Sequence, residues 1–386
     1  MNESFDVVIV GAGIVGAACA CECAALGMKT AVLDAAGVGG GATAAGMGHL
    51  VVMDDSPAQL DLTRWSVELW RALAPELPRQ AEFELRGTVW VAADEEEMAE
   101  VRRKKKLYSA AGVEAEILDE QALAECEPHL RGGLAGGLLV PMDAVIYPPC
   151  AAAYLLERAV DRGASLKTGR RVVSAGSGRV LLENGIEVRG RAIVNACGAN
   201  APHLTPSLPL KKRRGHLVIT ERYPNFAHHQ LVELGYLKSA HSLTTDSVAF
   251  NVQPRQTGQL LIGSSREYGA EDREINHTLL AAMLKRAQEY MPSIGDLQAI
   301  RVWTGFRAAT PDKLPLIGPW PEDESVFLAT GHEGLGITTS LATAKLLASI
   351  LAGAESAIAL EPYLPSRFLG RQAVQDATQQ PEAAHG

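Results

Sequence analysis

The first 34 residues constrain the fold more than any other part of the chain. A run of mostly β-branched residues, FDVVIV at positions 5–10, is followed by a glycine-rich turn and an alanine-rich segment, and the run TAVLD then ends at Asp34. An apolar run of this kind is typical of a strand that is buried on both faces of a parallel sheet. The order strand, glycine turn, helix and strand therefore predicts the first βαβ unit of an α/β domain.

The glycine turn carries Gly11, Gly13 and Gly16 in the spacing G-x-G-x-x-G. In a dinucleotide site the first glycine allows a tight turn, the second lets the backbone approach a pyrophosphate, and the third permits close helix packing. The free N–H groups at the start of the helix bind the anion, and Asp34 would accept hydrogen bonds from ribose hydroxyls. We therefore expect a dinucleotide site, with a glycine-rich turn that binds nothing as the alternative.

A second glycine-rich segment, GVGGGATAAGMGHLVV at 37–52, follows Asp34. An NAD-binding chain would usually continue with alternating strands and helices, whereas these glycines could lay the backbone against a ligand. Here the chain resembles the D-amino-acid oxidase superfamily of FAD enzymes. In that family such a segment runs along the pyrophosphate and beneath the isoalloxazine, so the resemblance implies FAD as the cofactor.

Three later stretches resemble the same family, in the same order. They are RAIVNACGANAP at 191–202, VWTGFRAATPDKLPLIG at 302–318 with Ala308 where proline is usual, and a strand, GHEGLG loop and long helix at 327–351. That helix would point its positive end at the flavin. The resemblance assigns cofactor contacts to Gly11, Gly13, Ile14, Val15, Gly16, Asp34, Ala42, Thr43, Gly46, Met47, Gly48, Val172, Ala196, Gly198, Gly305, Gly331, Gly334, Leu335, Gly336, Ile337 and Thr338. Relatives in this family that bind flavin covalently use a cysteine near the motif at 302–318, and none is present here. The resemblance therefore implies non-covalent FAD.

Arg307 stands among apolar residues, glycines and prolines of the kind that line interiors. In the family the arginine of this motif holds the substrate α-carboxylate, and a planar guanidinium suits bidentate binding of a carboxylate. An internal ion pair with Asp312 is the alternative. Trp303 is expected to pack in the core rather than to contact the substrate.

Two histidines and three polar residues complete the candidate site. His49 and His332 are the ionisable candidates for receiving an amine proton, because histidine titrates near neutrality, although either could be only structural. Asn251, Ser264 and Ser265 are expected to line the face of the flavin opposite the cofactor domain.

The fold class is α/β, with a Rossmann-like FAD-binding domain and a second, mostly antiparallel-sheet substrate domain. HLVITE, SVAFNVQ and QLLIGSS have the patterns of antiparallel strands. The FAD-binding domain is expected to comprise 1–80, 145–205 and 298–370, the substrate domain 81–144 and 206–297, and a flexible tail 371–386. The DEEE and RRKKK clusters of one predicted helix are expected on a solvated face, with a docking surface as the alternative.

Charge and composition exclude several classes of function. The net charge of −9 argues against a nucleic-acid partner. No stretch reaches ~18 uninterrupted apolar residues, and the N-terminus lacks the basic region of a signal peptide. A cytoplasmic location is therefore expected, with peripheral attachment to the inner membrane as the alternative. None of the six cysteines forms a CxxC pair, so no metal site is expected.

Within the superfamily, two segments narrow the expectation. GMGHLVVMDDSPAQLDLTRWSVELW and GHEGLGITTSLATAKLL resemble the flavin subunits of bacterial multi-subunit dehydrogenases. The resemblance implies oxidation of a C–N bond by hydride transfer to flavin N5, and partners that carry electrons away: an α-type flavoprotein subunit and a small iron–sulfur subunit. D-hydroxyproline or a related imino acid is the favoured substrate. An opine such as octopine or nopaline is second, and a glycine or sarcosine oxidase using O2 is the further alternative.

Overall fold

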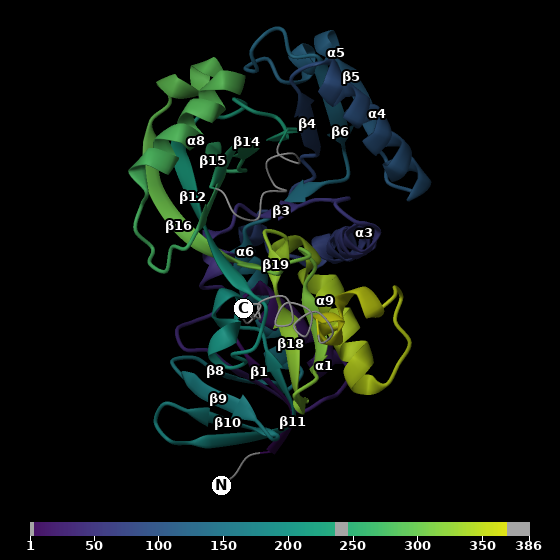
Figure 1. The fold of residues 1–386 in the computed structure, drawn as a ribbon, viewed down its shortest axis with the longest axis vertical. Helices are drawn as coiled ribbons and strands as arrows, with labels where there is room; N and C mark the ends of the chain where they lie inside the picture. The colour runs from purple at the N-terminus through teal and green to yellow at the C-terminus, as the bar shows by residue number, and fades with distance from the viewer. Residues whose placement is uncertain (1–3, 236–245, 369–386) are drawn as a thin grey trace, which may run out of the picture.

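Two β-sheets, each covered by helices, form the two lobes of the molecule. The computed structural model describes residues 4–235 and 246–368. The lower lobe in Figure 1 carries an eight-stranded sheet, and the upper lobe carries a nine-stranded sheet. The mixed α/β fold class expected from the sequence is therefore confirmed.

The eight-stranded sheet is centred on the apolar run that opens the chain. Its strands are β17 (Leu316–Trp320), β18 (Asp323–Thr330), β11 (Glu187–Asn195), β1 (Ser4–Val10), β2 (Thr30–Leu33) and β8 (Ser165–Lys167) in spatial order, with β10 (Arg179–Leu182) and β9 (Val172–Gly176) extending from β11. β1 pairs in parallel with β11 and β2. Because its central side chains are buried on both faces, an uninterrupted apolar sequence suits it.

Small residues let three helices pack closely on this sheet. They are α1 (Ile14–Ala25), α6 (Pro148–Asp161) and α9 (Gly336–Ala352), and α1 contacts both of the others. The buried face of α1 consists largely of alanines, glycine and the cysteines Cys19 and Cys23. These two cysteines are core residues, as expected for packing rather than ligation.

The nine-stranded sheet is antiparallel apart from one pair of strands. Its order is β19 (His332–Glu333), β16 (Ala299–Ala309), β12 (Lys211–Arg222), β15 (Gln259–Tyr268), β14 (Ser247–Pro254), β13 (Gln230–Glu233), β4 (Thr88–Ala92), β6 (Gly136–Val140) and β5 (Glu116–Asp119). Within it, β13 and β4 are the pair that runs parallel. β12, β14 and β15 contain the three sequence segments from which an antiparallel sheet was expected.

The remaining elements connect and cover the two sheets. They are α2 (Ala42–Ala45), α3 (Pro57–Leu73), α4 (Glu95–Ala110), α5 (Glu120–Cys126) and α8 (His277–Tyr290), the strand pair β3 (His49–Leu50) and β7 (Ala144–Val145), and 3-10 turns at Ala74–Glu76, Arg79–Ala81, Gly198–His203, Pro292–Asp296, Glu361–Tyr363 and Pro365–Phe368. α8 packs against β14 and β15 of the upper lobe.

The segment 298–370 is divided between the two sheets. β16 pairs with β12 from Ala309 to Ala299, and β19 pairs with β16, so both belong to the nine-stranded sheet. β17, β18 and α9 of the same segment belong to the lower lobe. Strand pairing thus differs here from the expected boundary, because β16 is long enough to reach from one lobe to the other (Figure 1). The expected tail, 371–386, lies outside the described residues.

One lysine of the RRKKK cluster is not solvated. Lys104 on α4 is fully buried, forms an ion pair with Asp54, and lies over the rings of Trp90 and Tyr108. Burial lowers the pKa of Lys104, and the nearby Asp54 carboxylate opposes that shift. The helix is therefore held on the segment that follows β3 by a buried charge pair, which corrects the expectation of a wholly solvated charged face.

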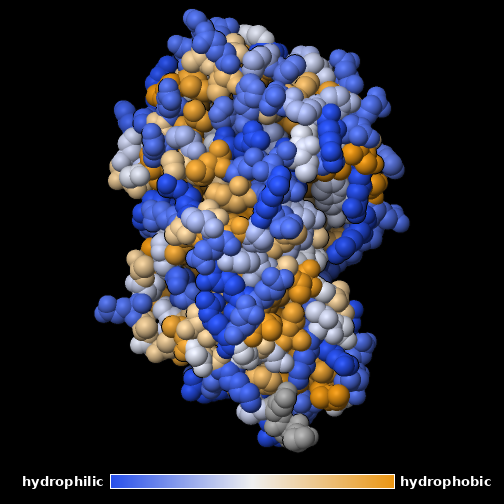
Figure 2. Space-filling view, turned by 180° about the vertical axis from the view of Figure 1, so that it is seen from behind, coloured by the Kyte–Doolittle hydropathy of each residue, from blue (hydrophilic) through white to orange (hydrophobic). Residues whose placement is uncertain are grey.

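Within residues 4–235 and 246–368, no helix is both long and apolar enough to cross a bilayer. Hydrophilic side chains cover most of the face shown in Figure 2, with smaller apolar groups between them. Nor do the same residues gather three or more His, Cys, Asp or Glu side chains into an arrangement that could hold a metal ion.

Candidate active site

A cavity of about 770 Å³ lies where the two sheets meet. It is lined by the first glycine turn, the second glycine-rich segment, the loop before α9, and one face of the nine-stranded sheet. The expected cofactor residues that line it are Gly11, Gly13, Ile14, Val15, Asp34, Ala42, Thr43, Gly46, Met47, Gly48, Val172, Ala196, Gly198, Gly305, Gly331, Gly334, Leu335, Gly336 and Ile337. Residues far apart in the sequence thus form one continuous wall.

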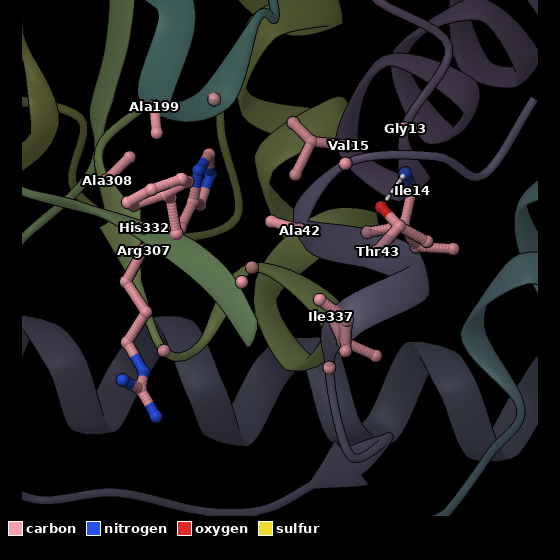
Figure 3. A pocket seen from close by; sticks show the side chains of 18 of the residues that line it. Gly13, Ile14, Val15, Ala42, Thr43, Ala199, Arg307, Ala308, His332 and Ile337 are labelled. Atoms are coloured by element: carbon pink, nitrogen blue, oxygen red, sulfur yellow. Dashed lines mark hydrogen bonds between the residues drawn. The ribbon is translucent and has the colours of Figure 1, made fainter. Parts of the chain in front are cut away.

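The two glycine-rich segments are joined by a hydrogen bond at the start of α1. The Ile14 N–H donates to Thr43 Oγ1 at 2.9 Å, and both residues line the cavity (Figure 3). Gly11 has φ +112°, and a Cβ there would lie 2.5 Å from the Ala196 carbonyl oxygen. Gly11 is therefore required for two reasons: its backbone conformation, and its close approach to the loop that follows β11.

Gly16 acts beneath the cavity wall rather than in it. A Cβ at Gly16 would lie 1.9 Å from the carbonyl oxygen of Gly11. Gly16 is absent from the cavity lining, so among the described residues its role is to let α1 pack against the turn. This is the packing role that the fingerprint gives to its third glycine, whereas the expected direct contact with the cofactor is not supported by this placement.

Asp34 both lines the cavity and organises the glycine turn. Its carboxylate accepts hydrogen bonds from the Ala12 N–H at 2.8 Å and from the Ala36 N–H at 2.7 Å. A carboxylate oxygen has two acceptor positions, so these bonds leave capacity for ribose hydroxyls. The sequence motif indicated the ribose role but gave no sign of the bonds that fix the turn.

The loop before α9 brings a helix start to the cavity. Gly336 and Ile337, the first residues of α9, line the cavity, and a Cβ at Gly46 would lie 2.6 Å from Ile337 Cδ1. Thr338 lies outside the lining, because its hydroxyl donates to the His49 carbonyl at 2.9 Å. Thr338 therefore holds the strand pair near α9, and this placement does not support its expected contact with the cofactor.

Arg307 on β16 faces the cavity from the side opposite the glycine turn (Figure 3). Its Nη1 donates to the Ser265 carbonyl at 2.9 Å, and its guanidinium lies over Gly215, where a Cβ would be 2.5 Å from Nη1. Asp312 pairs instead with Arg367, at 2.8 and 3.1 Å. The alternative of an ion pair between Arg307 and Asp312 is therefore wrong.

Trp303 packs rather than lining the cavity. Its indole N–H donates to the Ala45 carbonyl at 3.3 Å, and it is absent from the cavity lining. Trp303 thus fixes α2 against β16, as a packing role requires.

The two candidate histidines both line the cavity but titrate far below neutrality. Burial lowers the pKa of His49 to about 4 and that of His332 to about 3. His332 Nε2 lies 3.0 Å from Thr343 Oγ1, whereas the buried His49 Nε2 has no hydrogen-bond partner among the described residues. Both rings are neutral at pH 7, so the expectation that they titrate near neutrality and accept an amine proton is not supported.

The shifted histidine predicts an acid-sensitive stability. An unfolded histidine titrates near 6.5, whereas folded His49 titrates at about 4. Below pH 6.5 the unfolded chain therefore binds a proton that the folded protein does not, and stability falls as the pH drops toward 4. We expect His49→Gln to remove on the order of 2 kcal/mol of the stability lost between about pH 7 and about pH 5.

Urea unfolding at the two pH values measures this difference. His203→Gln, the same substitution at an exposed histidine outside the cavity, is the matched control. A wild type and a His49→Gln variant that lose equal stability on acidification would contradict the assignment.

Asn251 and Ser264 line the cavity, but Ser265 does not. The Ser265 hydroxyl accepts a hydrogen bond from the His216 N–H at 2.9 Å and lies 2.9 Å from His216 Nδ1. Ser265 therefore joins β15 to β12 within the sheet, which corrects its expected place on the flavin face.

Sequence reasoning missed further lining residues, including Trp90 and Arg266. The sequence signal for these residues is the alternation of side chains along β4 and β15. That alternation assigns a residue to one face of the sheet, but it does not show which face lines the cavity.

The cavity wall fits a dinucleotide with a flavin. Gly13 and Gly48 line the cavity without a side chain, and each is packed so closely that a Cβ would lie 3.1 Å from Thr43 Oγ1 or 1.9 Å from the Ile146 carbonyl oxygen. Cys197 is the one cysteine in the described lining. Burial raises its pKa to about 12, and its thiol donates to the Val10 carbonyl at 3.4 Å. A neutral, bonded thiol accords with a non-covalent cofactor.

Comparison with known proteins gives one consistent result. The family model "DAO: FAD dependent oxidoreductase" matches residues 6–350. Glycine oxidase of Geobacillus kaustophilus is 30% identical over 97% of this chain and 100% of that protein. Its crystal structure superposes with a TM-score of 0.83 at 28% identity, over 94% of this chain and 99% of that chain.

Two further relatives are named as components of larger enzymes. The HcnC component of the Pseudomonas aeruginosa hydrogen cyanide synthase is 28% identical over 95% of this chain and 97% of that protein. One component of the Rhizobium meliloti opine oxidase is 25% identical over 95% of this chain and 99% of that protein. The similarity in each case extends across both lobes.

Proposed function

Since the chain belongs to the DAO family of FAD-dependent oxidoreductases, we propose that it oxidises the carbon–nitrogen bond of a small amino or imino acid to the imine. FAD, when bound, supplies the acceptor for a hydride from the substrate α-carbon. The protein must then bind, orient and shield the substrate. The observation that carries the proposal is the placement of Arg307 in the cavity wall, across from the glycine turn.

Arg307 is proposed to bind the substrate carboxylate. Its Nη1 is fixed by the Ser265 carbonyl, and Gly215, where a Cβ would lie 2.5 Å from Nη1, leaves room for the guanidinium. The bond to the Ser265 carbonyl orients the planar guanidinium fork, whose geometry suits a carboxylate. The relatives that are named for an amino acid, the glycine oxidases, support the same class of substrate.

The substrate amine is proposed to lose its proton to solvent rather than to a histidine. His49 and His332 have pKa values of about 4 and about 3, lowered by burial. Bases this weak are poor acceptors for the amine proton at neutral pH. The neutral His49 ring can instead orient the substrate through its Nε2, which has no hydrogen-bond partner among the described residues.

D-hydroxyproline or a related imino acid is the substrate we favour. Its support is the resemblance to dehydrogenase flavin subunits, together with Asn251 Oδ1 and Ser264 Oγ of the nine-stranded sheet, which have no hydrogen-bond partner among the described residues. An opine is the second candidate, supported by the similarity to the opine oxidase component. Glycine or sarcosine is third, supported by the similarity to glycine oxidases.

Anaerobic bleaching of the flavin across a panel of substrates tests the proposal. The panel holds D- and L-proline, the hydroxyprolines, sarcosine, glycine and octopine. We expect at least one to reduce the flavin completely, with the hydroxyprolines fastest. A flavin that dithionite reduces but that no amino or imino acid reduces would contradict the proposed function.

We further propose that the chain works within a hetero-oligomer, in the cytoplasm or at the inner membrane. Two relatives are named as components of larger enzymes. The proposed partners are an α-type flavoprotein and a small iron–sulfur protein, which would carry electrons away.

This arrangement predicts a slow reaction with oxygen. The reduced protein should pass electrons to an artificial dye much faster than to O2, so hydrogen peroxide should be a minor product. Stopped-flow reoxidation measures both rates on the same preparation. Reoxidation in air that matches the turnover with dye would make the protein an oxidase.

A further inference from the structure

We propose that the face of the nine-stranded sheet that lines the cavity contains a subsite for a hydroxyl group on the substrate side chain, formed by Asn251 and Ser264. The inference rests on the proposed function, because it assumes that an amino or imino acid occupies the cavity. Asn251 and Ser264 would then select the substrate by its side chain, and the group that they select is a hydroxyl.

Strand register aligns the residues of this face in one row. Trp90 on β4 is the direct partner of Val232 on β13, Val232 is the partner of Asn251 on β14, and Asn251 is the partner of Gly263 on β15. Direct partners in a sheet project from the same face. Trp90, Val232 and Asn251 all line the cavity. Ser264, the residue after Gly263 on β15, also lines the cavity, beside this row.

Three polar groups in or beside this row lack hydrogen-bond partners within the described part of the chain: Asn251 Oδ1, Ser264 Oγ and Trp90 Nε1. Asn251 is 7% exposed and Ser264 is 4% exposed, yet Asn251 Oδ1 and Ser264 Oγ are both buried without a partner. Buried polar groups are nearly always hydrogen-bonded, and one left unpaired is destabilising. The adjacent Ser265, which lies outside the cavity lining, is bonded to His216. A ligand in the cavity can supply partners for Asn251 and Ser264, because both residues line it.

The unpaired groups lie beside the proposed carboxylate site. Arg307 Nη1 donates to the carbonyl of Ser265, the residue directly after Ser264. A substrate held at Arg307 by its carboxylate therefore has Ser264 and Asn251 within the same section of the cavity wall. Apolar Val232 and the indole of Trp90 continue the row beyond them. The row thus offers the polar groups of Ser264 and Asn251 first, then apolar Val232, and then an indole whose N–H has no partner among the described residues.

A hydroxyl group fits the chemistry of these two residues. A side-chain amide and a serine hydroxyl can each donate and accept, and a hydroxyl on the ligand can also do both. An aliphatic side chain would leave both groups unpaired. A second carboxylate would instead call for a cation, and Arg266 on β15, which also lines the cavity, is the residue that would supply it. Binding measurements separate these two cases.

The test uses ligands that bind without reacting. Cyclopentanecarboxylate and 3-hydroxycyclopentanecarboxylate have no nitrogen, and they differ by the one hydroxyl group. Isothermal titration calorimetry on the FAD-loaded protein gives the Kd of each. We expect the hydroxylated ligand to bind about 5- to 150-fold more tightly to the wild type, the range for one buried hydrogen-bonded group.

Variants then assign the preference to the row. Asn251→Leu, which keeps the volume and removes the polar atoms, should bring the ratio of the two Kd values close to one, and Ser264→Ala should reduce it. Ser247→Ala, at the start of β14 and outside the cavity lining, is the control and should keep the wild-type ratio. If Asn251→Leu fails to bind FAD, Ser264→Ala alone still decides the outcome.

Two results would overturn the inference while leaving the proposed function intact. One is equal binding of the two ligands by the wild type. The other is tighter binding of cyclopentane-1,3-dicarboxylate than of the hydroxylated ligand, which would assign the subsite to a charged group at Arg266. If no carboxylate ligand binds at all, the proposed carboxylate site fails as well, and that result is distinct from the other two.

Discussion

Arg307→Lys should lower kcat/KM by ~30- to 1000-fold and leave the FAD content nearly unchanged. Lysine keeps the positive charge but loses the planar fork that binds both carboxylate oxygens. Weakening a charge-assisted pair in a desolvated site costs roughly 2 to 4 kcal/mol, which corresponds to this loss of rate. The side chain lies across the cavity from the glycine turn, so the cofactor site should not respond (Figure 3).

Two controls distinguish a carboxylate site from a structural role. Arg301→Lys makes the same change on the same strand at an exposed residue outside the cavity, and it should have little effect. The substrate carboxamide lacks the charge that Arg307 binds, so the wild type and Arg307→Lys should differ much less on it. A variant that loses FAD, or that is equally impaired on the carboxamide, would show that Arg307 stabilises the fold instead.

Gly16→Ala should weaken FAD binding by between about tenfold and more than about a hundredfold. The added Cβ would lie 1.9 Å from the Gly11 carbonyl oxygen, which is backbone and cannot rotate away. Overpacking costs roughly 1 to 3 kcal/mol even where side chains can adjust, and here the glycine turn itself must shift. The expected result is a protein that keeps its secondary structure but binds FAD poorly.

Quenching of FAD fluorescence measures this Kd, and circular dichroism checks the fold. Gly132→Ala is the matched control, because a Cβ at Gly132 meets nothing within 4 Å and the residue lies outside the cavity. An unchanged FAD Kd in Gly16→Ala would contradict the account of the glycine turn.

The cofactor side of the site was predictable because its determinants are local. Gly11, Gly13 and Asp34 act within one strand, turn, helix and strand, so their spacing alone fixes their relation. The resemblance to a known family added the second glycine-rich segment and Arg307, and all of these residues line one cavity.

The substrate side was not predictable in the same way because its residues meet through strand pairing. Trp90 and Asn251 are far apart in the sequence and share a row only because Val232 on β13 pairs with both. The same reason explains the misplaced residues. Ser265 lies away from the cavity against His216, and Thr338 bonds to His49 across a long separation in the sequence. No spacing in the sequence encodes these partners.

The histidines show a further limit of sequence reasoning. An ordinary pKa is a property of an exposed side chain, and His49 and His332 depart from it only because folding buries them. The buried Lys104, which looked like part of a solvated charge cluster, departs for the same reason. Burial of a charge depends on the tertiary fold, so the charge pattern of a helix does not report it.

The most direct test of the account is the rate of anaerobic flavin reduction in a single turnover, measured with the best substrate of the panel and with the same compound deuterated at the α-carbon. If the protein removes a hydride from the α-carbon of an amino or imino acid, the flavin should bleach fully and the deuterated compound should react more slowly, with one imine or its hydrolysis product formed per flavin reduced. Bleaching that is equally fast with both compounds and yields no such product would contradict the proposed oxidation of the carbon–nitrogen bond.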